Sequence, residues 1–342
     1  MADRRSVRLG ARRRRVWLGQ ALGIAGSALA AACTGASLQP AVPEHLSDAA
    51  ASGQAEDGRV PLAGRILYVS SSNIHVWANG ATTQLTADGA SRQPSWSPDG
   101  HLIAHIKVQN SSSDIWVMEA AGAKLWRLTY YGQQPIERRR WAFRPRYWPT
   151  GNKLLFLSDE GTYDLMVWQL GLDGQRGSPL LRVPDGEGGL DHPSVSPDER
   201  RLLVTSYREE RPQVWTWALP SGPWQQLTHA PGGAYDPAWS PDGTHIAYTQ
   251  RQADKHDIWV MRVDGSGTTP LTTSGRARAP CWSPAGDAVA YIGDGGAGFD
   301  IWSAPVPPAL VTADGASAVA AEPRQLTRGA SVDAVSGLSW TG

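Results

Sequence analysis

The chain has 342 residues, of which 41% are hydrophobic and 19% are charged, and this balance excludes a largely disordered protein. Its 37 glycines, 25 prolines and 16 tryptophans are typical of an all-β protein with short strands and many turns. The first 32 residues hold seven arginines and one aspartate, which leaves 25 basic against 31 acidic residues in the remainder. This acidic body argues against nucleic acid as a partner, because phosphate binding relies on concentrated Lys and Arg.

Residues 1–32 are predicted to form an export signal peptide. A basic head, an apolar stretch and a tail of small residues are the three parts of a secretory signal. The alternative is a membrane-spanning helix, which needs about 20 apolar residues, whereas the run found here is shorter and interrupted by glycines. Arg14 and Arg15, followed by Val-Trp-Leu, resemble the twin-arginine export signal, and the general export route remains the alternative.

Residues 33–61 are predicted to be a flexible tether that starts at a lipidated cysteine. The sequence AAAC at 30–33 resembles the lipobox of bacterial lipoproteins, which implies that Cys33 carries the lipid. The tether is rich in Ala, Ser, Gly, Pro and acidic residues and has no periodicity. With Cys33 modified, Cys281 has no disulfide partner, and we expect it to be a small buried hydrophobic residue.

Residues 62–342 repeat one unit. Its start reads Pro-x-Trp-Ser-Pro-Asp-Gly at 94–100 and 237–243, and related starts lie at 145–151, 193–199 and 280–286. In such a start, Pro fixes φ at a turn position, Asp accepts a local hydrogen bond, and Gly takes the left-handed position that closes a hairpin. Each start therefore predicts a tight turn that leads into an apolar strand.

Each unit continues with a second strand and a Leu-Thr pair. The second strands are expected at 73–77, 114–118, 164–168, 213–217, 257–261 and 300–304. Leu-Thr pairs follow at 85–86, 128–129, 227–228, 271–272 and 326–327, with Leu181-Arg182 as the variant. Four of the second strands open on an aspartate, which we expect to cap a turn and not to bind calcium, because each lies in a different unit: Asp114, Asp164, Asp257 and Asp300.

The spacing of the units predicts a six-bladed β-propeller with four-stranded blades. The aromatic position of the start recurs every 43 to 58 residues, at Trp96, Tyr147, Val195 (the one exception to aromatic character), Trp239, Trp282 and Trp340. One four-stranded sheet cannot bury both of its faces, but copies stacked around an axis can. The tryptophans are therefore expected to pack between blades and not to stack on carbohydrate.

The last unit stops just after its start, at Ser339-Trp340, while the first unit lacks such a start. A closed propeller cannot leave a strand edge exposed between its first and last blades. We predict that the C-terminal strand pairs into the first blade beside Ile66-Leu67-Tyr68 and closes the ring.

These units, over residues 62–342, resemble the propeller repeat of the TolB family. The resemblance implies a six-bladed propeller of the periplasm or cell envelope that binds other proteins. TolB proteins carry an α/β domain before the propeller, where this chain has its tether, so their partners are not transferred to it. Similar repeats occur in prolyl-oligopeptidase-type peptidases, but this chain has no Gly-x-Ser-x-Gly elbow.

No motif for catalysis, metal or cofactor binding is recognisable. The eight histidines show no pair with the spacing of a helical zinc site, and no phosphate-binding glycine loop precedes a helix. We predict no catalytic residue, no metal and no cofactor.

A ring of residues just before the innermost strands is the first candidate binding site. It contains Gln93, Arg144, His192 and Asp236, with Ala279 in the fifth position. In a propeller these positions lie near one mouth of the central channel, where ligands commonly bind. The mixed chemistry suits a binding site, and it equally suits solvated loops that vary freely.

The long link at 130–144 is the second candidate. It carries a concentration of arginine and aromatic residues, types that are enriched at interface hot spots: Arg138, Arg139, Arg140, Trp141, Phe143 and Arg144. On an acidic body this basic patch suits a protein partner or an anionic surface. The alternative is a solvated loop whose aromatic side chains pack beneath it.

We therefore expect an exported, membrane-anchored, monomeric lipoprotein that binds a protein partner in the cell envelope through the channel-mouth face and is not an enzyme. The alternative is a propeller hydrolase or lyase that acts on a polysaccharide or peptide at the channel mouth. Paired carboxylates or a histidine–metal cluster at the mouth would favour the enzyme, and only His192 and Asp236 hint at such a group.

Overall fold

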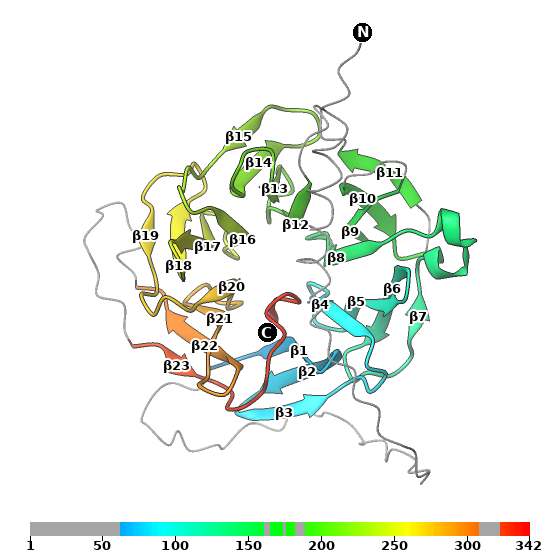
Figure 1. Cartoon of the computed structure of the whole chain (residues 1–342), viewed down its shortest axis with the longest axis horizontal. Helices are drawn as coiled ribbons and strands as arrows, with labels where there is room; N and C mark the ends of the chain where they lie inside the picture. The colour runs from blue at the N-terminus through cyan, green and yellow to red at the C-terminus, as the bar shows by residue number, and fades with distance from the viewer. Residues whose placement is uncertain (1–61, 161–164, 174–175, 182–188, 308–321) are drawn as a thin grey trace. The chain divides into compact units, whose positions relative to one another are not determined.

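The computed structural model describes residues 62–160, 165–173, 176–181, 189–307 and 322–342. In these residues, six four-stranded antiparallel sheets are arranged as blades around a central axis (Figure 1). The all-β class and the six-bladed propeller with four-stranded blades are thus confirmed.

The blades follow one another in chain order, except that the last strand belongs to the first blade. Blade 1 consists of β24 (Ser339–Thr341), β1 (Arg65–Ser70), β2 (Asn73–Ala78) and β3 (Ala81–Gln84). Blade 2 consists of β4 (Ser91–Trp96), β5 (Leu102–Gln109), β6 (Ser112–Glu119) and β7 (Trp126–Arg127). Blade 3 consists of β8 (Ala142–Tyr147), β9 (Lys153–Ser158), β10 (Met166–Gly171) and β11 (Arg176–Leu181).

The second half of the ring has the same construction. Blade 4 consists of β12 (Leu190–Val195), β13 (Arg201–Ser206), β14 (Gln213–Ala218) and β15 (Trp224–Gln226). Blade 5 consists of β16 (Ala234–Trp239), β17 (His245–Gln252), β18 (Lys255–Arg262) and β19 (Thr269–Pro270). Blade 6 consists of β20 (Arg278–Trp282), β21 (Ala288–Asp294), β22 (Phe299–Pro305) and β23 (Arg324–Gln325).

The Ser-Pro-Asp-Gly start forms a self-contained turn between the first two strands of a blade. In blade 2 the Ser97 hydroxyl donates to Asp99 Oδ1 at 2.5 Å and accepts the backbone N–H of Leu102 at 2.9 Å. Gly100 takes a φ of +69°, which favours glycine, and its N–H donates to the Ser97 carbonyl at 2.9 Å. The repeated start therefore fixes the hairpin that joins β4 to β5, and blade 5 repeats this turn with Ser240 and Asp242.

The Leu-Thr pair and the aspartate of the second strand cap one another. In blade 2 Thr129 Oγ1 accepts the N–H of Ile115 at 2.9 Å and donates to Asp114 Oδ1 at 2.9 Å. Asp114 Oδ1 also accepts the N–H of Tyr131 at 2.6 Å. The same arrangement recurs with Asp257 and Thr272, and with Asp300 and Thr327, while Gln213 replaces the aspartate opposite Thr228; Asp164 lies outside the described residues. These aspartates thus act in the turns, as expected.

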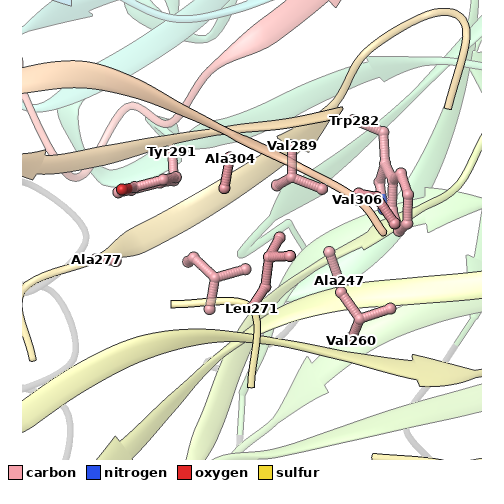
Figure 2. Close-up of a cluster of buried hydrophobic side chains, with 10 residues drawn as sticks. Ala247, Val260, Leu271, Ala277, Trp282, Val289, Tyr291, Ala304 and Val306 are labelled. Atoms are coloured by element: carbon pink, nitrogen blue, oxygen red, sulfur yellow. The ribbon is translucent and has the colours of Figure 1, made fainter. Parts of the chain in front are cut away.

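Buried apolar side chains fill the junctions between neighbouring blades. Between blades 5 and 6, Leu271 and Val260 face Val289 and Ala304, with Trp282 at one end of the cluster (Figure 2). The Trp282 indole N–H crosses the junction and donates to the Ala238 carbonyl at 3.2 Å. Trp96 and Trp239 make the same bond to the preceding blade, at 3.2 and 3.4 Å. The tryptophan of the repeat therefore packs between blades, as predicted.

The C-terminal strand closes the ring. β24 pairs antiparallel with β1, and the register places Trp340 opposite Ile66 and Ser339 opposite Leu67. Figure 1 shows the C-terminal end of the chain beside the blue strands of blade 1. The predicted completion of the first blade by the last strand is confirmed.

The predicted export signal with Arg14 and Arg15, and the predicted lipid site at Cys33, lie outside the described residues. Within the described part of the chain, no helix has the length and apolar character needed to cross a bilayer.

Candidate binding site at the central channel

The innermost strand of each of blades 2 to 6 contains a bulge. In blade 2, for example, the pairing of β4 with β5 shifts register between Arg92 and Ser95. At each bulge one residue adopts a left-handed conformation with φ between +50° and +55°, and these residues are Gln93, Arg144, His192, Asp236 and Ala279. Such a conformation costs a non-glycine residue about 1 kcal/mol or more, and a bulge redirects the side chain. The five predicted ring positions thus share one strained geometry.

A sixth ring position, in blade 1, was not identified from the sequence. Gly337 lies three residues before Trp340, just as Gln93 lies three residues before Trp96, and it has a φ of +71°. The spacing from the aromatic position of the repeat was the signal that could have found it. Because glycine has no side chain, blade 1 contributes no functional group at this position.

The ring residues of blades 2 to 4 are joined by hydrogen bonds. Gln93 Oε1 accepts the N–H of Arg144 at 2.8 Å. The Arg144 guanidinium donates from Nε to Asp191 Oδ1 at 3.0 Å, and its Nη1 donates to the carbonyl of Val335. Asp191 directly precedes the ring residue His192 in β12. Arg144 therefore connects blade 3 to blade 4 and to the segment that leads into β24.

The chain of contacts continues from blade 4 to blade 6. His192 Nε2 lies 3.1 Å from Asp236 Oδ1 of blade 5, and His192 Nδ1 lies 3.4 Å from Asp191 Oδ2. The other oxygen of Asp236 accepts the Thr249 hydroxyl at 3.3 Å, and Thr249 Oγ1 accepts the N–H of Ala279 at 3.1 Å. The structure thus brings all five predicted positions into one network, and it adds Asp191 and Thr249, which the sequence did not indicate.

Burial and charge set the protonation of this network. Burial alone would lower the pKa of Arg144 and raise that of Asp191, but the attraction between the two shifts both pKa values in the opposite directions. Burial, followed by the Arg144 charge, lowers the pKa of His192, although the Asp191 and Asp236 carboxylates oppose this. At neutral pH we therefore expect an ionised Arg144–Asp191 pair beside a neutral imidazole.

Arg146 is a second channel arginine, and its charge is not balanced in the same way. Its guanidinium Nη1 donates to the Pro94 carbonyl of blade 2 at 3.3 Å, and burial lowers its pKa. A Cβ at Gly337 would lie 3.8 Å from Arg146 Nη2, so the guanidinium reaches the position that the blade 1 glycine leaves open. Among the described residues, no carboxylate forms an ion pair with Arg146. The side chain can therefore pair with an anion that enters the channel.

Cys281 lies in β20, the innermost strand of blade 6. Cys281 is half-buried, not fully buried as expected. Desolvation nevertheless raises the pKa of its thiol to about 11, although the Arg146 charge opposes this, and a protonated thiol of this kind is not a nucleophile. In the described part of the chain, no group of three or more His, Cys, Asp or Glu side chains could hold a metal ion.

The predicted patch in the link before β8 is divided by the structure. The link contains the 3₁₀ turns η1 (Tyr131–Gln133) and η2 (Ile136–Arg138), and Arg138 is exposed. Arg139 donates to Ser111 Oγ at 2.6 Å, and Arg140 donates to the Arg139 carbonyl at 2.8 Å.

The remaining members of the patch lie further inside. Half-buried Trp141 stacks on Phe143, with ring centroids 5.8 Å apart and planes 3° from parallel. Phe143 is buried, and Arg144 belongs to the channel network. An exposed interface can therefore include the three arginines from 138 to 140 and the edge of Trp141, but not Phe143 or Arg144.

The comparisons with known proteins agree with this fold. The Tol-Pal system protein TolB of Anaeromyxobacter dehalogenans (strain 2CP-C) is 34% identical over 116 residues, which are 33% of this chain and 25% of that protein. The match thus spans about a quarter of the length of this curated relative. The crystal structure of TolB from Acinetobacter baumannii superposes with a TM-score of 0.62 at 17% identity, covering 81% of this chain and 66% of that one.

A second structure gives a similar result. Putative TolB from Agrobacterium tumefaciens superposes with a TM-score of 0.58 at 18% identity, covering 78% of this chain and 90% of that one. At these identities the superpositions establish the fold alone. The family model of the TolB β-propeller domain matches residues 136–306, which is half of the chain, and the chain therefore belongs to the TolB β-propeller domain family.

Proposed function

We propose that this protein is a non-catalytic, Tol-Pal-type binding propeller of the cell envelope, which engages a protein partner at the mouth of its channel. The family supports an envelope role, since the similar protein of A. dehalogenans is a Tol-Pal system protein. The signal-like segment with Arg14 and Arg15 and the lipobox-like Cys33 support export and a lipid anchor. The anchor and the tether would hold a monomeric propeller near a membrane surface.

The unpaired Arg146 guanidinium is the observation that carries the binding proposal. Arg146 is half-buried, and a guanidinium that is partly withdrawn from water without a carboxylate partner is costly, so an incoming anionic group lowers that cost. Arg144 and His192 already have acidic neighbours, so they form part of the channel wall. Arg146 instead has guanidinium N–H groups that no carboxylate of the described residues accepts. The partner would therefore present a carboxylate, from an acidic side chain or a C-terminus, at the channel mouth.

The test begins with cross-linking in the native cell and identification of the partner. Binding of the purified partner would then be measured for the intact chain and for the Arg146→Met variant, with Arg200→Met as the control because Arg200 is exposed on a turn of blade 4. We expect Arg146→Met to weaken binding at least tenfold and the control to leave it unchanged. Equal affinity of all three proteins would refute binding at the channel mouth.

One observation supports the enzyme alternative. The carboxylates of Asp191 and Asp236 flank the His192 imidazole at 3.4 and 3.1 Å, and these residue types serve in general acid–base catalysis. However, the three groups are engaged with one another and with Arg144. Turnover of an envelope polysaccharide or peptide that is abolished by His192→Gln but retained by Arg146→Met would favour an enzyme over the binding propeller.

A further inference from the structure

The outer rim of the propeller between blades 2 and 3 carries an unusual cluster of exposed apolar side chains. In the described part of the chain, the large hydrophobic residues that are exposed are Leu125, Tyr130 and Ile136, at 40%, 52% and 73%. All three lie within twelve residues of sequence, just before and after β7, the outermost strand of blade 2. Isolated exposed apolar residues are ordinary, whereas a cluster of them marks an interaction surface.

One of the three, Tyr130, lines a hollow, which we call the rim groove; Leu125 and Ile136 lie close in sequence to other residues that line it. The groove has a volume of about 980 Å³, and among the residues that line it are Trp126, Arg127, Tyr130, Arg138, Arg140 and Leu172. It lies on the side of blade 2 away from the channel, because β4 is the innermost strand and β7 the outermost. The rim groove is therefore separate from the candidate site at the channel mouth.

The exposed Tyr130 is held in place from below. The Arg127 guanidinium lies 4.9 Å from the centroid of the Tyr130 ring, and it pairs with the buried carboxylate of Asp114 at 2.5 Å. Since Arg127 is fixed by this ion pair, the aromatic ring above it is presented in a defined position. A rigid, partly exposed tyrosine of this kind can act as an anchor at an interface.

Positive charge surrounds the groove on the side of the link. Among the described residues, the guanidinium groups of Arg138, Arg139 and Arg140 form no ion pair with a carboxylate; the hydrogen bonds of Arg139 and Arg140 go to neutral oxygens. The chain after residue 32 is acidic as a whole, so this concentration of arginine is a local feature. It selects for an occupant that carries negative charge.

The opposite wall of the groove excludes a uniformly anionic occupant. Glu160 and Asp173, both from blade 3, also line the hollow, and Glu160 accepts the Tyr131 hydroxyl at 2.8 Å. A sheet of anionic lipid headgroups would place negative charge against these carboxylates. A polypeptide can direct its acidic side chains to the arginines and its apolar side chains to Tyr130, Trp126 and Leu172.

We propose that the rim groove docks an acidic segment of a partner protein, with at least one large apolar side chain seated against Tyr130 and with carboxylates on Arg138 and Arg140. This second interface is independent of the channel mouth. It allows the propeller to hold two partners, or two parts of one partner, at the same time.

The test uses fluorescent 12-residue peptides of defined composition, with four acidic residues and two large apolar residues in mixed order. Their binding to the full chain would be measured by anisotropy in low and in moderate salt, beside peptides in which lysine replaces every acidic residue. We expect the acidic peptides to bind in the micromolar range, more weakly as salt rises, and the lysine peptides not to bind. Binding of both peptide sets with equal affinity would overturn the proposal.

Matched variants separate the two contributions. The double variant Arg138→Glu/Arg140→Glu and the double variant Tyr130→Ser/Ile136→Ser should each weaken acidic-peptide binding at least tenfold. Arg200→Glu/Arg211→Glu, which changes the charge equally at exposed positions of blade 4, should have no effect. All these side chains lie at the surface, and unchanged melting curves would confirm intact folding.

Other occupants give distinguishable results. Binding to phosphatidylglycerol-containing vesicles that is lost in Arg138→Glu/Arg140→Glu, without binding of the acidic peptides, would assign the groove to a membrane surface and overturn the proposal. Concentration-dependent dimerisation lost in Tyr130→Ser/Ile136→Ser would assign it to a second copy of the chain. Loss of peptide binding in Arg146→Met alone would place the peptide in the channel instead.

Discussion

Removal of residues 336–342 tests how the propeller is closed. This deletion takes away β24 and leaves β1 as an open edge next to blade 2, while the other blades keep all four strands. The first blade loses its innermost strand, and the ring loses the ladder between β24 and β1. The bridge between Val332 and Ser70 and the hydrogen bond from the Asp333 N–H to the Val69 carbonyl remain as the contacts of the C-terminal segment with β1. We expect a large loss of stability from the deletion of only seven residues.

The size of the loss follows from the contacts of the strand. Leu338 is buried and Trp340 is half-buried, and together they contribute about 4 kcal/mol at the usual value for burying large apolar side chains. The Trp340 indole N–H donates to the Ala63 carbonyl at 3.1 Å, and Ser339 Oγ accepts the N–H of Trp96 at 3.0 Å. These two bonds add about 2 kcal/mol, which gives a total of about 6 kcal/mol. A loss of this size is a large part of the about 5–15 kcal/mol that stabilises a typical protein.

The measurement is the free energy of unfolding in urea, supported by thermal melting. A loss of about 6 kcal/mol corresponds to a fall in melting temperature of about 12–24 °C for a domain of this size. Deletion of Gly342 alone is the control, since β24 ends at Thr341 and the glycine is exposed. Trp340→Phe should give an intermediate loss of about 1 kcal/mol, because it removes the indole N–H. A deletion variant that melts within about 3 °C of the intact chain would show that β24 does not close the ring.

Three further predictions concern single residues. His105 is fully buried, which lowers its pKa to about 3, below the value of about 6.5 in the unfolded chain. The unfolded state therefore binds the proton first, and the free energy of unfolding falls as the pH drops below about 6.5. In urea titrations, His105→Leu should reduce the loss of stability between pH 6.5 and 5 by about 2 kcal/mol. Asp114→Ala removes the acceptor of Arg127 Nη2 and of the Tyr131 N–H and should cost about 3 kcal/mol or more of the free energy of unfolding. An equally stable variant would show that the cap contributes nothing. In a Cys33→Ser background, the half-buried Cys281 thiol, with its pKa raised to about 11, should react with Ellman's reagent at pH 8 far more slowly in the folded than in the urea-unfolded chain. Equal rates would show that the fold does not protect the thiol.

The architecture could be predicted because each turn is encoded locally. Hydrogen bonds within one repeat form the turn of Ser97 with Asp99 and the cap of Asp114 with Thr129. The residues that make these bonds recur at fixed spacing in the sequence. Once the repeat was aligned, closure by residues near Trp340 followed from the missing start of the first unit. Because each turn depends on residues within its own repeat, the strand order and the closing strand could both be predicted from a single sequence.

The channel network could be predicted only in part. The spacing from the aromatic position located the ring residues, but it gave no sign of the bulges that put Arg144 and His192 into a left-handed conformation. Asp191 was missed because its role depends on contact with Arg144, which lies 47 residues away in the sequence and in another blade. Contacts of this kind are set by the relative placement of blades, which the repeat pattern does not specify.

The basic link shows a second limit. Its arginine and aromatic residues form one run in the sequence, but β8 begins at Ala142, and from there alternation directs successive side chains to opposite faces of the blade. Phe143 therefore enters the core, and Arg144 enters the channel at the bulge. The arginines Arg138 and Arg140 share the rim groove instead with Tyr130, at the start of the link. Residues that are adjacent in this link therefore share one exposed surface only up to the point where β8 begins.

Arg144 links the channel to the closure of the ring, and this determines how binding at the mouth has to be tested. Its guanidinium holds Asp191 of blade 4 and the Val335 carbonyl, just before β24. A substitution of Arg144 would leave the buried Asp191 carboxylate unpaired and would also loosen the segment that closes the ring. Any loss of binding in such a variant would therefore be inseparable from a loss of structure. Within the described residues, Arg146 makes one hydrogen bond, to the Pro94 carbonyl, and it faces the open position of Gly337. Its substitution therefore reports on the occupant of the channel and leaves the closure intact.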